Sequence, residues 1–207
     1  MSESKPEKQT ARLEAFSDGV FAIAITLLAL ELKVPHFTAE AGEPTSVALA
    51  KSLASQWPSY FSFVTSFFTV LIMWVHHHTI FRLVLRADAK LLFANGFLLM
   101  VVTVVPFPTA VVSEYLRTPA APAACTLYAG TFVLIAIGFW LVLNAAFRRS
   151  TVDPNASEAT LNRLRSSYRL GPPLYLLAAI SAPFSPWLAM AICTGLWILW
   201  AVTTREC

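Results

Sequence analysis

Asp18 is the first side chain in this sequence whose chemistry conflicts with its surroundings, because it stands at the start of a long apolar run. A charged carboxylate at the centre of a membrane span costs roughly 2.5–3.5 kcal/mol. On a helix that turns about 100° per residue, Ile23, Thr26 and Leu30 share one face. Asp18 points away from that face, so we expect it to join a structural polar cluster with neighbouring helices rather than to bind an ion or relay protons.

The face that carries Ile23 and Thr26 permits two interpretations. Small residues recur along this helix at three- and four-residue spacing, which is typical of close helix packing in membranes. In the other interpretation, rings of Ile23, Leu27 and Leu30 from several subunits form a hydrophobic constriction, which can gate by dewetting. Thr26 would add a ring of hydroxyl groups to it. From periodicity alone, packing is favoured. The small residues are Ala15, Gly19, Ala22, Thr26 and Ala29.

Three consecutive histidines, His76 to His78, end a second apolar run. Imidazole binds transition metals, but neighbouring residues on a helix point about 100° apart, so three in a row do not converge on one ion. The flanking turn offers neither a Cys nor a carboxylate to complete a ligand set. We therefore predict no metal site.

His77 instead has the spacing of a structural residue. Trp74 lies three residues before it and Phe81 four residues after it, so the three share one helical face. Asn95 lies at a similar depth in a third apolar run. We expect polar groups at one depth on three helices to form a hydrogen-bonded cluster in which His77 and Asn95 meet Asp18.

Signatures of enzymes are missing from the sequence. It contains no GxSxG or HExxH motif, no phosphate-binding glycine loop and no pair of acids at helical spacing deep in an apolar run. We predict neither enzymatic activity nor a cofactor. The TVGYG loop that forms the filter of ordinary potassium channels is also absent, so any ion selectivity must arise in another way.

The composition places these residues in a membrane. Of the 207 residues, 57% are hydrophobic and 13% are charged, which is more apolar surface than a soluble core of this length can bury. The backbone of a protein in a lipid bilayer must satisfy its own hydrogen bonds, which leaves helices or closed barrels. Apolar runs without two-residue alternation exclude a barrel, so the predicted fold class is an all-α membrane protein. The basic residues form short clusters between the runs, which argues against a nucleic-acid partner.

Six apolar segments meet or approach the roughly 20 residues needed to cross a bilayer. The fifth is the weakest, because Gly171, Pro172 and Pro173 break its start, and a re-entrant hairpin is the alternative there. We expect a single domain over residues 1–207, with spans near residues 13–32, 53–75, 91–113, 123–147, 167–183 and 187–203.

Lys and Arg accumulate on the cytoplasmic side of short loops, and this bias sets the orientation. With both termini in the cytoplasm, the outer segments hold only Lys33, Lys51 and Arg117. We expect residues 1–11 and 150–162, which are polar, to be mobile. The first span is expected to be uncleaved, because no small-residue cleavage site follows it. The inner basic residues are Lys5, Lys8, Arg12, Arg82, Arg86, Lys90, Arg148, Arg149, Arg163, Arg165, Arg169 and Arg205.

The string from Arg12 to Gly19, RLEAFSDG, is similar to the RxxxFSDG signature that opens the first helix of one membrane protein family. This is the endosomal and lysosomal potassium channel family of transmembrane protein 175, with its bacterial relatives. Trp74, His77 and Phe81 resemble that family's second pattern, WxxHxxxF. The second half of the chain resembles the family only in hydropathy.

The resemblance implies a potassium-permeable channel without a re-entrant filter, in which the first helices surround the pore. It implies that Ile23 narrows the pore and that Thr26 contributes to selectivity, with Leu27 and Leu30 continuing the constriction. The chain has one six-span unit, as in the bacterial members, so the resemblance implies a homotetramer in a bacterial cell membrane. The permeating ion would be K⁺, with selectivity over other monovalent cations left open.

With this resemblance, lining the pore becomes the favoured role for the helix face of Ile23, Thr26, Leu27 and Leu30. The remaining motif residues are then structural. A secondary transporter and a membrane scaffold without a permeation path are the alternative functions. The structural network would comprise Arg12, Phe16, Ser17, Asp18, Gly19, Trp74, His77, Phe81 and Asn95.

Overall fold

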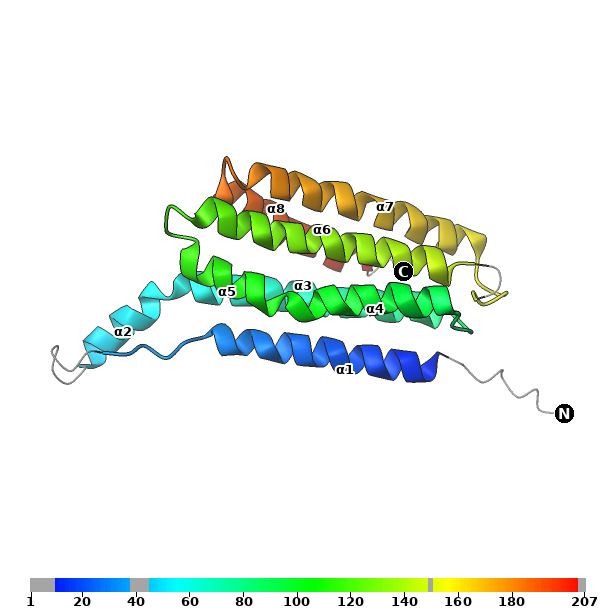
Figure 1. Ribbon diagram of the computed structural model, residues 1–207, viewed down its shortest axis with the longest axis horizontal. Helices are drawn as coiled ribbons and strands as arrows, with labels where there is room; N and C mark the ends of the chain where they lie inside the picture. The colour runs from blue at the N-terminus through cyan, green and yellow to red at the C-terminus, as the bar shows by residue number, and fades with distance from the viewer. Residues whose placement is uncertain (1–9, 38–44, 149–150, 205–207) are drawn as a thin grey trace.

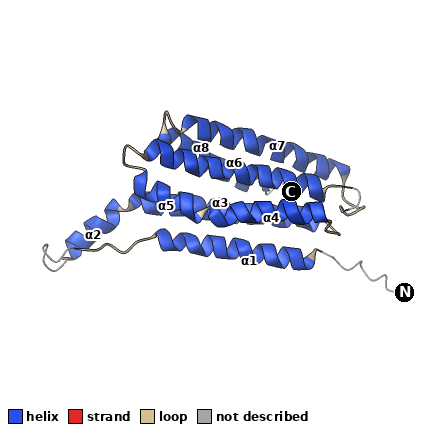
Figure 2. Ribbon diagram, viewed as in Figure 1, coloured by secondary structure: helices blue, strands red, loops and turns tan. Residues whose placement is uncertain are grey.

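The structure, a computed structural model, describes residues 10–37, 45–148 and 151–204. The expectations for residues 1–9, and for the charges of Lys5, Lys8, Arg149 and Arg205, fall outside these ranges. Helices joined by loops and turns make up the described chain (Figure 2). They are α1 (Ala11–Leu27) with its 3-10 extension η1 (Leu28–Glu31), α2 (Ser46–Ser55), α3 (Trp57–Arg82), α4 (Ala89–Val104), α5 (Pro106–Tyr115), α6 (Ala121–Ala146), α7 (Glu158–Ser181) and α8 (Pro186–Thr204).

Four of these stretches are long and apolar enough to cross a membrane, so the chain is an all-α membrane protein as predicted. They are Ala11–Glu31, Trp57–Arg82, Ala89–Tyr115 and Ala121–Ala146, and Pro186–Val202 is a shorter apolar helix. The long helices run side by side (Figure 1). Helix α1 lies at one side of the bundle, α7 lies at the other, and α4, α5 and α6 lie between them. Helix α2 points away from the bundle.

The helix starts follow from their sequences. The Asp88 carboxylate accepts a hydrogen bond from the Leu91 backbone N–H at 2.9 Å, and the Thr45 hydroxyl accepts one from that of Ala48 at 3.2 Å. Both side chains satisfy a donor that has no partner within its own helix. Proline stands in the first turn of α3, α5 and α6, where its missing N–H costs nothing.

The structure refines two of the expected spans. The segment near residues 91–113 is not one uninterrupted helix, because α4 ends at Val104 and α5 begins at Pro106. Proline has no N–H to continue the ladder, and Val105 N–H donates instead to the Val102 carbonyl at 3.1 Å. The segment near residues 53–75 is divided, because its first residues belong to α2 and the long helix starts at Trp57.

Helix α7 also differs from the expectation. It begins at Glu158 and runs through Pro172 and Pro173 to Ser181, so these prolines do not break its start. Its 24 residues correspond to about 36 Å of helix, and it packs along α6, which excludes the short hairpin that we considered. Residues 150–162 were expected to be mobile, but α7 includes the last five of them. Leu161 in this part is buried against the core.

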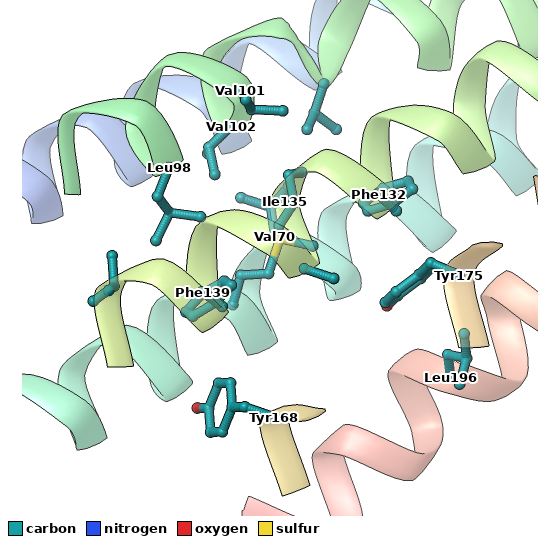
Figure 3. Close-up of a cluster of buried hydrophobic side chains, with 14 of the residues drawn as sticks. Val70, Leu98, Val101, Val102, Phe132, Ile135, Phe139, Tyr168, Tyr175 and Leu196 are labelled. Atoms are coloured by element: carbon teal, nitrogen blue, oxygen red, sulfur yellow. The ribbon is translucent and has the colours of Figure 1, made fainter. Parts of the chain in front are cut away.

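Helix α6 is the centre of the core and packs against α4, α5, α7 and α8. Figure 3 shows Phe132, Ile135 and Phe139 of α6 among side chains from the surrounding helices. At Gly138 the approach to α4 is so close that a Cβ atom would lie 3.1 Å from Leu98 Cδ1 and 3.2 Å from Leu98 Cα. A larger residue than glycine would require Leu98 to shift at this crossing.

Candidate functional site

Three side chains from three helices form a directed chain of buried hydrogen bonds. His77 Nε2 of α3 donates to Asn95 Oδ1 of α4 at 2.8 Å, because an amide oxygen can only accept. Asn95 Nδ2 donates to Ser17 Oγ of α1 at 2.9 Å, and Ser17 donates to the Leu13 carbonyl at 2.8 Å. All three side chains are essentially inaccessible to solvent. These bonds join α1, α3 and α4, and each of the three side chains has a hydrogen-bond partner.

Asp18 is adjacent to Ser17 in this hydrogen-bond network. We expected it to pair with His77, but it does not. Its Oδ1 accepts a hydrogen bond from Trp74 Nε1 at 2.8 Å, at an exposed position. Trp74 stands almost one helical turn before His77, so two bonds at successive turns connect α3 to its neighbours. Side-chain direction, which residue spacing does not give, decides this pairing.

Aromatic rings enclose His77. The Phe81 ring stacks on the imidazole with centroids 4.3 Å apart, and the Phe21 ring lies 5.4 Å away. Both phenyl rings are buried. The other predicted network residues on α1 lie elsewhere, since Arg12, Phe16 and Gly19 are exposed on the surface of the single chain.

The three consecutive histidines diverge. His76 Nδ1 accepts a hydrogen bond from the Tyr168 hydroxyl at 2.7 Å or donates to it, according to the tautomer. His77 meets Asn95, and His78 lies over the Trp74 ring. Among the described residues no group of His, Cys, Asp and Glu is arranged to hold a metal ion.

The stripe of Ile23, Thr26, Leu27 and Leu30 lies on the open face of α1. In the single chain the exposed fractions are 58% for Ile23, 40% for Leu27 and 73% for Leu30. Thr26 is also exposed, and its hydroxyl donates to the Ile23 carbonyl at 2.9 Å. The opposite face of α1 is buried through Ser17, Phe21 and Ala24. One face of α1 thus packs against the rest of the chain, and the other presents apolar side chains and a hydroxyl.

A second buried polar cluster, which we did not predict from the sequence, lies between α3, α5 and α6. The Ser66 hydroxyl of α3 lies 2.8 Å from Thr109 Oγ1 of α5 and 3.0 Å from the Tyr128 hydroxyl of α6. Hydroxyl side chains recur in α3 at Ser62, Ser66 and Thr69, all buried, and this spacing was the available signal. The cluster joins α5, just after the break from α4, to α3 and α6.

The chain is similar to known membrane proteins in sequence and in structure. Residues 12–106 match the family of the endosomal/lysosomal potassium channel TMEM175. A potassium channel of Chamaesiphon minutus is 48% identical over 207 residues, covering 99% of this chain and 100% of the relative. A potassium channel of Streptomyces collinus is 43% identical over 183 residues, covering 86% of each chain. The crystal structure of a lysosomal potassium-selective channel TMEM175 homolog from Chamaesiphon minutus superposes with a TM-score of 0.84 at 46% identity, covering 94% of this chain and 97% of that one.

Proposed function

The chain belongs to the TMEM175 family of potassium channels, and from this premise we propose that its pore is formed by the exposed face of α1. The protein is an ion channel rather than an enzyme, and K⁺ is the ion that it conducts.

The open stripe on α1 is the observation that carries the proposal. A helix of 17 residues that buries only Ser17, Phe21 and Ala24 in its own subunit has a wide face left for something else. Ile23 lies on this face with no oxygen to replace the water of a cation, so a ring of Ile23 side chains opposes dehydrated ions unless it widens and wets. Thr26, one helical turn further along, supplies a hydroxyl beside that ring. Leu27 and Leu30 extend the apolar lining.

The buried hydrogen-bond chain supports a structural role for the rest of the motif. Ser17 and Asp18 connect α1 to α3 and α4 on the side away from Ile23. They therefore fix the rotation of α1 about its axis, and this rotation decides which residues face the pore. We assign Asn95, His77 and Trp74 to the same role.

A pore needs several copies of α1, so we propose a homotetramer with six spans in each subunit and both termini in the cytoplasm. Helices α7 and α8, which pack on α6 and on each other, supply the two spans beyond the four long apolar stretches. The described basic side chains Arg82, Arg86, Lys90 and Arg148 at one end of the bundle support this orientation. The bacterial relatives support a location in a bacterial cell membrane.

Conduction is tested with purified protein in liposomes that hold a potassium gradient. Open-pore permeation predicts current that stays linear in single channels, and bi-ionic reversal potentials then rank K⁺ against Na⁺. Flux that saturates and follows a proton gradient would indicate a transporter. An assembled oligomer without current would indicate a scaffold.

Topology and assembly need a separate measurement. A single cysteine probe introduced at Thr45 should be labelled from outside in cells and one at Ser157 should not be, in a background without the native cysteines. Labelling of both from the same side would contradict the six-span arrangement. The mass of the purified oligomer gives the number of subunits independently.

A further inference from the structure

A groove of about 640 Å³ runs between α4 and α6 at the basic end of the bundle. It is the size of many ligand sites, but it is open along one side. The groove uses none of the pore-lining or network residues assigned above. Its walls come from two helix faces, with Lys90 and Phe93 on α4 and with Leu141 and Ala145 on α6, and Arg148 lies just beyond the end of α6. These are spaced by three or four residues, so each set lies on one side of its helix.

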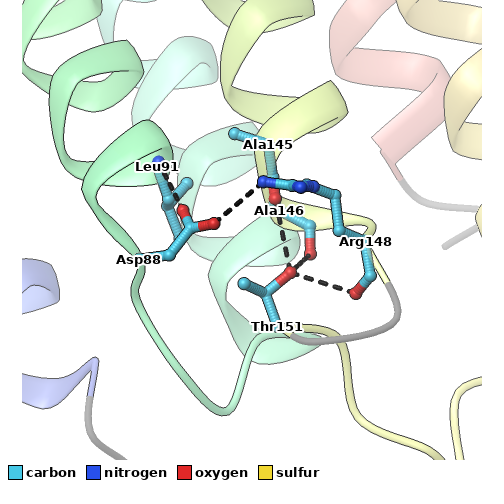
Figure 4. Close-up of polar contacts among 6 residues, drawn as sticks. All are labelled: Asp88, Leu91, Ala145, Ala146, Arg148 and Thr151. Carbon is cyan, nitrogen blue, oxygen red and sulfur yellow. Dashed lines mark hydrogen bonds and ion pairs between the residues drawn. The ribbon is translucent and has the colours of Figure 1, made fainter.

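The mouth of the groove is basic, and the position of one of its charges is fixed. Asp88 Oδ1 caps Leu91 N–H at 2.9 Å while its Oδ2 accepts from the Arg148 guanidinium at 3.0 Å (Figure 4). This uses one of the five N–H groups of Arg148. The Thr151 hydroxyl lies 2.7 Å from the Ala146 carbonyl and holds the turn that carries Arg148.

Lys90 adds the second charge. It is exposed and makes no ion pair with any residue that the structure describes. Asp88, Arg148 and Lys90 together leave one net positive charge at the mouth, with donors from both cations available to an anion.

The body of the groove is apolar. The Phe93 side chain is 81% exposed, and Leu141 is also exposed. Both lie on helical stretches that are apolar enough to cross a membrane, and the small side chains of Ala94 and Ala145 form part of the lining between them. Charge at one end and hydrocarbon along the rest match an amphiphile with an anionic head.

We propose that this groove binds an anionic phospholipid, with its phosphodiester headgroup on Lys90 and Arg148 and an acyl chain along Phe93 and Leu141. Basic pockets between transmembrane helices at the cytoplasmic side are suited to such headgroups. A free anion would gain nothing from Phe93, and a zwitterionic lipid has no net charge for the basic mouth. The site does not depend on conduction, so it stands or falls separately from the proposed pore.

The test is the thermal stability of the purified oligomer in detergent, titrated with dioleoylphosphatidylglycerol or with dioleoylphosphatidylcholine. The anionic lipid should stabilise the protein and the zwitterionic lipid should not. Lys90→Gln leaves the Asp88–Arg148 pair intact and should raise the half-saturating concentration of phosphatidylglycerol about fivefold, which corresponds to ~1 kcal/mol for one basic side chain. Arg82→Gln, exposed at the same end but outside the groove, is the matched control and should change it less than about twofold.

Phe93→Ala tests the acyl contact without touching charge. It should weaken stabilisation by the dioleoyl lipid and leave the weaker effect of dihexanoylphosphatidylglycerol unchanged. Equal losses in Lys90→Gln and Arg82→Gln, an equal response to phosphatidylcholine, or the same stabilisation by inorganic phosphate would overturn the proposal. So would disulfide cross-linking of Phe93→Cys to a second subunit, which would mean that another copy covers the groove.

Discussion

Helices α1 (with η1) and α6 are both apolar enough to cross a membrane, but different interactions hold them in the fold. Within an apolar 18-residue stretch of each, 22% of the residues are buried in α1 with its extension η1 and 56% are buried in α6. Most of helix α6 packs against apolar and aromatic side chains of neighbouring helices, with close contact to α4 at Gly138. Helix α1 lies at the side of the bundle (Figure 1) and is joined to α3 and α4 by side-chain hydrogen bonds.

This difference has a physical reason. Apolar side chains of a membrane protein gain little from leaving lipid for another apolar surface, so an edge helix with one free face cannot rely on hydrophobic burial. Hydrogen bonds are directional, and a few of them fix both the position and the rotation of such a helix. Helix α6 obtains its position and rotation mainly from packing against several neighbouring helices. Polar bonds are therefore expected to hold α1, and steric fit is expected to hold α6.

The largest expected effect is at Asn95. Replacing Asn95 by Ala leaves the buried His77 Nε2–H without an acceptor, which costs about 1–3 kcal/mol, and also removes the bond that Ser17 accepts, although Ser17 keeps its bond to the Leu13 carbonyl. We expect a marked fall in the thermal stability of the purified oligomer. Asn162→Ala, at an exposed position on α7, is the matched control and should lie within about 0.5 kcal/mol of the parent protein. Equal stability of the two variants would mean that packing alone holds α1.

A smaller effect is expected at Gly138, where steric fit decides. An added methyl group would meet Leu98 of α4 at 3.1–3.3 Å, and overpacking of this kind costs about 1–3 kcal/mol. The better helix propensity of Ala returns up to about 1 kcal/mol of that loss. Gly130 lies in the same helix, and a Cβ there would meet nothing within 4 Å, so Gly130→Ala should be neutral or stabilising. Melting temperatures of the two variants that shift in the same direction would contradict the close fit of α6 on α4.

The buried polar network was easier to predict from the sequence than the course of helix α7. Polar residues in apolar runs are few, so helical spacing alone brought His77 and Asn95 to one depth, and the structure places them 2.8 Å apart. Spacing did not predict that Asp18 would pair with Trp74, because that depends on side-chain rotamers. It also gave no sign that Arg12, Phe16 and Gly19 would be exposed in the subunit.

The start and the continuity of α7 were predicted wrongly because both depend on tertiary packing. The start of α7 looked like a polar loop, yet Leu161, Leu164 and Tyr168 are buried. Their three- and four-residue spacing is that of a helix with one apolar face, and it was the signal that average polarity concealed. Two prolines inside α7 do not end it, since contacts with α6 outweigh the local preference. The contacts that pack α7 on α6 join distant parts of the sequence, so they were not visible in it.

The smallest change in free energy is expected at Ile23, although it concerns function directly. If the open face of α1 lines the pore, Ile23→Asn puts an amide into the apolar ring, which then wets more easily and separates cations less well. A tenfold loss of potassium preference over sodium corresponds to ~1.4 kcal/mol, which bi-ionic reversal potentials resolve. Stability should barely change, because Ile23 is exposed in the subunit.

Ile25→Asn makes the same substitution on the other side of the helix and completes the comparison. Ile25 is partly buried against the core of its own subunit, so a polar side chain there should lower the yield of oligomer. Channels that do assemble should keep the parent selectivity. The two isoleucines thus separate the two faces of α1, one expected to act on current and the other on assembly. If Ile23→Asn left reversal potentials unchanged while Ile25→Asn shifted them, α1 would have to be rotated by roughly half a turn, and the hydrogen bonds of Ser17 and Asp18 would no longer explain how the pore face is set.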